Sequence, residues 1–506
     1  MKGHIHHLLA QIQEEAAIPA LIDIFNFCHD AEIELNRPLR IAITGEIKTG
    51  KSTLMNAFLG RYISPTAVEV WTYNVIWFHH ISSSDDGNEK FTVHYHNQVD
   101  ESRPLSSLEN FVAYNARGQG SLDNIYWVDV FLDHDLLRIF DLIDTPGLKS
   151  LIGKDSKHTC DLLTKKENKP DAIIYLVKKK GFQEEDISIV SQYHCAQTFD
   201  SVNDDCSTSG LISGIRAVAA ITRVDEIEGK YDAANEVIRR NQEDYAEIRY
   251  FFSQMLAIAA LPAQASYMLS DREIDTLRVL SMQDDISNYL YDRESFGKLN
   301  TISNDEKNHL LEQLTIKGVV LSIDYFQSNQ NSSNNEFRSF LYEFSNVGKL
   351  EDYIIRHFGR RADFYKCEAV IDGLKSICNR IVHNQKLIGP DRQKAIKILR
   401  NVNLEDYELH DYYASYYILN DYYNMEMYFN ESEWDKARLI LGDKGQKDFE
   451  RLSLLESSSM NEIRNAYEKE RLFWKCKSHK LHLKGNLKGS EVAKKIAEII
   501  ERQILK

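Results

Sequence analysis

The sequence reads Gly45-Glu46-Ile47-Lys48-Thr49-Gly50-Lys51-Ser52 between an apolar run and a helical pattern, and this stretch decides the fold. It matches G-x-x-x-x-G-K-[ST], the pattern of a phosphate-binding loop. The apolar residues 39–44 before it predict a strand, and residues 53–59 after it predict a helix. Average residue frequencies give such a match by chance in about one per cent of chains this long. The stretch therefore predicts an α/β domain that binds phosphate groups.

Each part of the loop has a physical role. The two glycines let the backbone wrap closely around phosphate oxygens, and N–H groups at the start of the following helix stabilise their negative charge. We expect the whole loop 45–52 and Thr53 to contact a nucleotide. Lys51 is expected to reach the β- and γ-phosphates and to support catalysis there, and the Ser52 hydroxyl is expected to ligate Mg²⁺.

A second motif, Asp144-Thr145-Pro146-Gly147, follows the apolar run 137–143. A phosphate-loop protein needs an acidic group at a strand end near its Mg²⁺, and Asp144 fits, through a metal-bound water. The N–H of Gly147 is expected to contact the γ-phosphate. Alone these four residues are an ordinary turn sequence, but at this distance behind a phosphate loop they favour a GTPase.

A third motif, Thr222-Arg223-Val224-Asp225, follows the apolar residues 218–221. GTPases carry Asn/Thr-Lys-x-Asp at this place, where the carboxylate accepts two hydrogen bonds from guanine. Asp225 is the candidate for this role, Thr222 opens the motif, and Arg223 can stack on a purine face in place of the usual lysine. The alternative is a helix start capped by an aspartate.

The stretch 64–72 between the first two motifs should hold the switch threonine of a GTPase. Its hydroxyl would ligate Mg²⁺ and its backbone would hold the attacking water. Thr72 is the first choice and Thr66 the second, although a threonine that opens a strand is also common. A last loop beside the base is expected near 259–263, without a single nameable ligand.

Composition bounds the remaining choices. The 506 residues are 43% hydrophobic and 27% charged, which excludes wholesale disorder and allows about three domains. The net charge of −15 argues against nucleic acid as a partner. Seven cysteines without a Cys-x-x-Cys pair fit the reducing cytosol. No apolar run is long enough to predict a transmembrane helix.

The chain divides into a central part with strand patterns and flanking parts with helical patterns. The strands are expected at 39–44, 75–79, 91–96, 125–132, 137–143, 172–177, 218–222 and 255–259. The segment 4–35 is expected to form one helix or two, with a kink or restart at Pro19. The other helices are expected at 271–281, 304–314, 317–327, 334–344, 348–357, 360–382, 404–429, 432–441, 459–474 and 490–505. The fold class is thus an α/β phosphate-loop GTPase domain, with a mainly parallel sheet flanked by helices, plus a large all-α helical-bundle region.

Together the motifs, and segments such as 170–177 and 350–362, resemble the dynamin superfamily of GTPases, and most closely its short bacterial members. The resemblance implies an N-terminal helix at 1–37 that packs with the helical region, a dynamin-type GTPase domain at 38–268 and a helical bundle or stalk at 269–506. It implies GTP or GDP with Mg²⁺ as cofactors and a nucleotide-dependent dimer with a second copy or a paralogous GTPase. It also implies membrane remodelling in many members.

Lys48 departs from the family, since dynamins usually carry there a serine that helps to hold a catalytic monovalent cation. One hypothesis is that the Lys48 ammonium replaces this cation between the β- and γ-phosphates. The alternative is a solvated lysine.

Other readings of the function stay open. A cytosolic GTP-dependent switch or scaffold could recruit a protein partner without membrane remodelling, and an ATP-using enzyme is a third class. The expected location is the cytoplasm, with peripheral contact at the inner face of a membrane left open. Residues 475–506 hold nine Lys or Arg against three Glu, so an amphipathic helix here could dock on acidic lipid. A final bundle helix with a solvated face is the favoured alternative.

Overall fold

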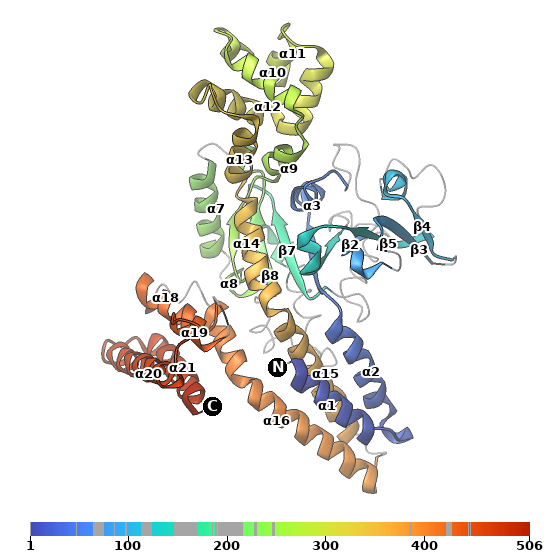
Figure 1. Cartoon of the computed structure of the whole chain (residues 1–506), viewed down its shortest axis with the longest axis vertical. Coiled ribbons are helices and arrows are strands. Elements are labelled where there is room, and N and C mark those ends of the chain that lie inside the picture. Colours follow the sequence, from blue (N-terminus) through green and yellow to red (C-terminus); the bar gives the residue numbers. More distant parts are fainter. Residues whose placement is uncertain are drawn as a thin grey trace.

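The computed structural model describes most of the chain. Outside the described residues lie 1, 47, 64–74, 85–86, 97–98, 113–123, 146–169, 185, 188–189, 191–215, 227–229, 245–247, 384–386, 421–427, 444, 446 and 506. Figure 1 shows a central sheet with helices above it, below it and to one side.

The described residues form one nine-stranded sheet in the order β4-β3-β5-β2-β6-β1-β7-β8-β9. Its strands are β1 Leu39–Gly45, β2 Ile76–His80, β3 Lys90–Tyr95, β4 Glu101–Arg103, β5 Ile125–Leu132, β6 Phe140–Asp144, β7 Ala172–Val177, β8 Ala217–Ile221 and β9 Met255–Ala257. Parallel pairs join β1 to β6 and β7, β7 to β8, β8 to β9 and β2 to β5. The pairs β2–β6, β3–β4 and β3–β5 are antiparallel. This mainly parallel sheet confirms the expected fold class.

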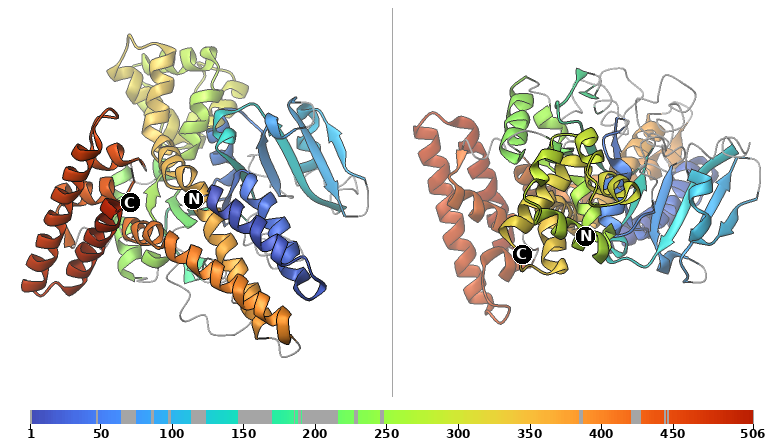
Figure 2. Two further views of the ribbon diagram at one scale, coloured as in Figure 1. Left: turned by 60° about the horizontal axis from the view of Figure 1, so that its bottom comes forward. Right: turned by 90° about the horizontal axis from the view of Figure 1, so that it is seen from above.

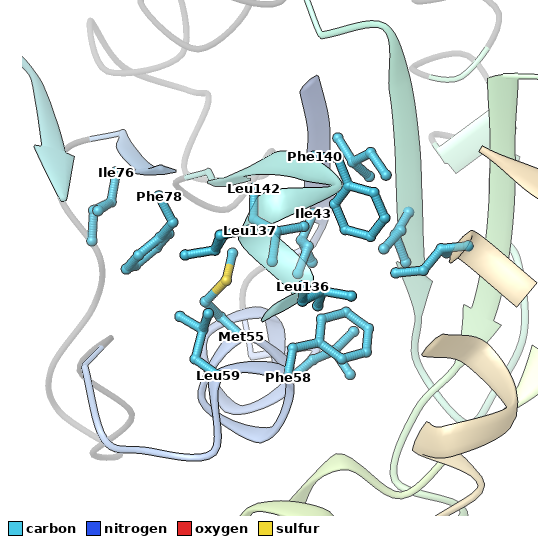
Figure 3. Packing of buried hydrophobic residues seen from close by; sticks show 14 of the residues in the cluster. Ile43, Met55, Phe58, Leu59, Ile76, Phe78, Leu136, Leu137, Phe140 and Leu142 are labelled. Atoms are coloured by element: carbon cyan, nitrogen blue, oxygen red, sulfur yellow. The ribbon is translucent and has the colours of Figure 1, made fainter. Parts of the chain in front are cut away.

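Helix α3 (Lys51–Leu59) follows β1 and packs its apolar side against one face of the sheet. Figure 3 shows Met55, Phe58 and Leu59 of this helix lying against Leu136 and Leu142. The strand and the helix on either side of the phosphate loop are therefore both part of the core, so the loop is held in place at both of its ends.

The core of the sheet is completed by a helix almost 300 residues after the phosphate loop. Helix α14 (Val347–His357) buries Val347, Leu350 and Ile354 in the same hydrophobic cluster as β1, β6 and α3, and Phe358 follows it there. The C-terminal half of the chain thus contributes directly to the α/β core.

The segment between β9 and α14 forms a separate helical unit, seen at the top of Figure 1. It contains α9 Ala260–Met268, α10 Asp271–Ser281, α11 Arg293–Gly297, α12 Asn304–Ser328 and α13 Asn334–Ser345, which share one apolar cluster. Helix α12 is interrupted at Thr315, whose φ of 59° and ψ of 173° are not helical. The expected division into 304–314 and 317–327 is therefore confirmed at this kink.

A second helical unit lies below the sheet and joins the N-terminal helices to helices more than 300 residues later in the chain. Helices α1 (Lys2–Glu15) and α2 (Ile22–Asn36) share a core with α15 (Ala362–Val382) and α16 (Gly389–Asn420). Figure 2 shows these four helices side by side. Arg37 after α2 forms an ion pair with Asp171 before β7, at 2.5 Å, so the unit is tied to the base of the sheet.

The C-terminal helices form a third unit. They are α18 Glu431–Ile440, α19 Asp448–Leu452, α20 Met460–Leu483 and α21 Leu487–Leu505. Their core includes Trp434, Trp474 and Ile496. The remaining described helices, α4 Glu109–Val112, α7 Lys230–Asp244 and α8 Ile248–Phe251, flank the sheet.

Most expected elements are confirmed, the helix expected at 4–35 is divided into α1 and α2 around Pro19, one strand was not expected, and one helix begins earlier than expected. Strand β4 was not expected, because Glu-Ser-Arg at 101–103 is a polar edge strand without an apolar pattern. The helix expected at 404–429 begins at Gly389, and Pro390 stands in its first turn, where a missing N–H costs nothing. Among the described helices, none combines the length and the apolar character needed to cross a bilayer.

Candidate nucleotide-binding site

The phosphate loop turns sharply at two glycines. Gly45 has a φ of 143°, and a Cβ there would lie 2.4 Å from the carbonyl oxygen of Leu176 in the neighbouring strand. Gly50 has a φ of 91° and is the N-cap of α3. A side chain is therefore excluded at Gly45 by β7 and disfavoured at Gly50 by the backbone. The first turn of α3, directly after Gly50, presents backbone N–H groups of the kind that bind an anion.

Lys51 lies buried at the centre of the loop. Its Nζ donates to the carbonyl oxygens of Glu46, at 2.8 Å, and Gly45, at 3.2 Å. Burial lowers the pKa of Lys51 to about 8, against the attraction of Asp144. The ammonium is thus held inside the loop by carbonyl oxygens, at the place where phosphate oxygens of a nucleotide would lie.

Ser52 and Asp144 meet beside the loop. The Ser52 hydroxyl donates to Oδ2 of Asp144, the last residue of β6, at 3.0 Å. Asp144 is fully buried, and the next residue, Thr145, donates from Oγ1 to the Ile43 carbonyl at 2.9 Å. One hydroxyl and one carboxylate at a helix N-terminus are oxygen donors of the kind that Mg²⁺ binds together with phosphate oxygens. The donor set therefore fits the expected metal.

The other loop residues lie around this centre. The Thr49 hydroxyl donates to the Glu46 carbonyl at 2.8 Å and so closes the loop on itself. Lys48 is exposed at the apex with a φ of 63°. Thr53 stands in the first turn of α3.

The third motif lies at the end of β8, on the same edge of the sheet. Thr222 is buried, and its N–H donates to the Val177 carbonyl at 2.9 Å. Arg223 has a φ of 60° and an exposed side chain, which forms an ion pair with Glu226 at 3.3 Å. Burial, together with the nearby Glu226, raises the pKa of Asp225 to about 6. Asp225 therefore carries its charge at neutral pH, as an acceptor for a base would need.

Ion pairs that the sequence analysis missed surround these motifs. Lys178, directly after β7, pairs with the buried Glu46 at 2.5 Å. Its neighbour Lys179 pairs with Glu226 at 2.9 Å. The signal was present, since three consecutive lysines, 178–180, follow a wholly buried strand at the carboxyl edge of the sheet.

Several predicted site residues lie outside the described residues. These are Ile47, the switch candidates Thr66 and Thr72, and Gly147. The last base-side segment is short, because β9 ends at Ala257 and α9 begins at Ala260.

Strand, phosphate loop and helix, with Ser52 beside Asp144 and an acidic residue after β8, define a phosphate-loop nucleotide-binding domain. Residues 41–206 match the model of the dynamin family. The isoniazid-induced protein IniC of Mycobacterium tuberculosis is 24% identical over 389 residues, which cover 73% of each chain. Dynamin-like protein 2 of Campylobacter jejuni is 21% identical over 485 residues, covering 94% of this chain and 68% of that protein.

A solved structure of an oligomerised bacterial dynamin pair aligns with 100% of this chain and 75% of that chain, at 14% identity and a TM-score of 0.37. The segment 41–206 thus matches the dynamin family, and the chain as a whole is similar to bacterial dynamin-like proteins.

Proposed function

We propose that this protein binds GTP with Mg²⁺ and hydrolyses it to GDP and phosphate. The observation that carries the proposal is the cluster of Lys51, Ser52 and Asp144 at one strand–loop–helix junction. Asp225 at the end of β8 selects guanine, because its carboxylate can accept two hydrogen bonds from the base.

The reaction is phosphoryl transfer to water, so positioning and charge neutralisation supply the catalysis. Mg²⁺, when bound, neutralises β/γ charge. Lys51 holds the β- and γ-phosphates, and Ser52 and Asp144 are the residues that would hold the metal. Thr72 and Gly147 position the water and the γ-phosphate.

Lys48 at the apex takes the place of a monovalent cation, which predicts similar turnover in sodium, potassium and choline salts of equal ionic strength. A strong potassium requirement would refute this role.

Nucleotide-dependent dimerisation with a second copy or a paralogous GTPase is part of the proposal, coupled to movement of the helical region. The division into 1–37, 38–268 and 269–506 is kept as its domain scheme. The structure offers a route for this coupling, since α14 packs in the core of the sheet and is followed directly by α15 of the lower helical unit.

Leu148 stands where related GTPases place a water-orienting glutamine. If dimerisation supplies the missing group, turnover per molecule should rise with protein concentration.

Membrane contact is proposed at the turn between α20 and α21. Leu483 and Leu487 are 72% and 62% exposed there, next to Lys484 and Lys488. Exposed leucines among lysines suit the surface of an acidic bilayer. GTP-dependent tubulation of vesicles would support remodelling. Its absence, together with a stable GTP-dependent protein partner, would favour the switch or scaffold alternative.

The deciding experiment measures binding of GTP to Lys51→Ala by calorimetry. Loss of the buried ammonium should abolish binding, whereas Lys349→Ala, an exposed lysine on α14, should bind like the wild type. Tight GTP binding by Lys51→Ala would refute the phosphate-loop assignment, and tighter binding of ATP than of GTP would refute the guanine assignment.

A further inference from the structure

A polar cavity of about 280 Å³ lies where the α/β core meets the C-terminal helices, away from the phosphate loop. Three segments far apart in the sequence form its walls. They are the residues just before β9, the end of α14 with the turn after it, and residues at the end of α16, on α18 and just after α18. The described lining residues are Ser253, Gln254, Tyr353, Arg356, His357, Arg361, Leu419, Trp434, Arg438 and Asp443.

The lining is positively charged. Among its described residues are the guanidinium groups of Arg356, Arg361 and Arg438 and a single carboxylate, Asp443, which leaves two positive charges. Asp443 accepts from Arg361 at 2.9 Å and from Arg438 at 2.7 Å. Asp435 lies 3.8 Å from Arg438, but its side chain is 56% exposed, so solvent screens this pair.

The arginines converge on the cavity from two different units. Arg361 is buried and is fixed by a hydrogen bond from Nη1 to Nδ1 of His357 at 2.9 Å. Arg356 is exposed, and its Nε donates to the Asp352 carbonyl at 3.1 Å, which orients the guanidinium plane. Arg438 comes from α18. Fixed planar guanidinium groups are the side chains that bind phosphate oxygens in a bidentate manner.

Charge and size together define the ligand. A phosphate monoester carries about 1.5 to 2 negative charges at neutral pH, which matches the surplus of the lining. At about 280 Å³ the cavity lies just below the range of about 300 to 1,000 Å³ that ligand pockets usually hold, so only a small ligand would fit it. Leu419, Trp434 and Tyr353 supply apolar surface for the carbon part of such a ligand.

We propose that this cavity binds a small phosphate monoester, which holds the C-terminal helices against the α/β core. Its floor is connected to the sheet, since the Tyr353 hydroxyl donates to Ser253 and Ser253 donates to the Ala217 carbonyl, both at 2.7 Å. Ala217 is the first residue of β8, the strand that ends at the Thr222–Asp225 motif. A bound phosphate would therefore bridge this strand and α18.

The test is calorimetry of the full chain with glycerol 3-phosphate as the probe, with GDP and Mg²⁺ in excess to fill the phosphate loop. The same titration is repeated with Lys51→Ala, whose phosphate loop should not bind nucleotide. Binding of the probe to this variant then reports on the cavity alone, even if the proposed GTP binding is wrong. Arg356→Gln and Arg438→Gln should each weaken binding at least tenfold, whereas Arg464→Gln, an exposed arginine on α20, should not. A parallel arm measures sedimentation of the same proteins with vesicles of phosphatidic acid, a phosphate monoester lipid, against phosphatidylcholine.

Binding of the soluble probe that depends on both cavity arginines assigns a free metabolite, and arginine-dependent binding to phosphatidic acid alone assigns a lipid headgroup. Absence of both kinds of binding overturns the proposal. Binding that Arg464→Gln weakens as much as Arg356→Gln also overturns it, because the effect would then be general surface charge.

Discussion

The Nζ of Lys178 lies 2.5 Å from Oε2 of Glu46, so the end of β7 holds the second residue of the phosphate loop. The pairing of β1 with β7 makes this contact, since Gly45 stands opposite Leu176. Glu46 is buried, and without a nearby cation its charge would oppose the arrival of phosphate.

We therefore predict that Lys178→Met weakens GTP binding about tenfold, which corresponds to about 1.4 kcal/mol. Adding Glu46→Gln should recover most of this loss, because the carboxylate that Lys178 neutralises is then gone. Calorimetric affinities of the two single variants and the double variant give the coupling energy directly. Purely additive losses would contradict the proposed role of the pair.

Affinity for GDP should pass through a maximum between about pH 6 and pH 8. Below the Asp225 pKa of about 6 the carboxyl group gains a proton and can no longer accept two hydrogen bonds. Above the Lys51 pKa of about 8 the empty site loses its ammonium, so binding must take up a proton. Affinity should then fall by up to about tenfold per pH unit.

Two variants separate these limbs from the ionisations of the nucleotide itself. Lys51→Arg keeps its charge and should lose the alkaline limb, whereas Asp225→Asn should bind more weakly and lose the acid limb. An unchanged pH profile in both variants would assign the two limbs to the nucleotide alone.

The pH dependence of stability should show a separate transition from a histidine in the sheet. His79 on β2 forms ion pairs with Asp129 at 3.2 Å and Asp141 at 3.1 Å. Burial alone would lower the pKa of His79, but the two carboxylates raise it to about 9. Because the folded pKa is above the ordinary value, this stabilisation is complete below about pH 6.5 and is lost as pH rises through 9.

His79→Gln should therefore lower the free energy of unfolding by about 3 kcal/mol at pH 7, since the buried Asp141 loses this cation while Asp129 keeps its ion pair with His94 at 2.9 Å. The loss should shrink towards pH 9.5. Urea unfolding at both pH values measures it, and an equal loss at the two values would contradict the assignment.

Leu350→Ala should destabilise the nucleotide-binding domain although it lies far from it in sequence. Leu350 is fully buried in the cluster that contains β1 and α3, so the truncation should cost about 2 to 5 kcal/mol. Leu455→Ala, at a side chain that is 76% exposed, is the matched control and should cost less than about 0.5 kcal/mol. Thermal unfolding with and without GDP reports whether the nucleotide site melts in the same transition.

Local sequence patterns predicted the strands and the phosphate loop well, whereas contacts between segments far apart in the sequence could not be predicted. Strands 125–132 and 172–177 were predicted to the residue, because one alternates in burial and the other is wholly apolar. The Ser52–Asp144 contact follows from two motifs whose spacing carries chemistry. The Glu46–Lys178 pair could not be predicted, because it depends on which strand lies beside β1. The packing of α14 could not be predicted either, because its apolar face does not specify which apolar surface it covers. Neither leaves a trace in local periodicity.

The position of α14 sets the order in which the protein can be completed during synthesis. The apolar face that Leu350 and Phe358 cover is made from residues 39–142 and others before 264, so it is on the chain well before its cover. Ribosomes add about 5–20 residues per second, so the 95 residues from 264 to 358 take roughly 5–20 s. For that interval the nascent domain has an uncovered apolar surface, which makes this period the natural point for a chaperone to bind and for aggregation to begin.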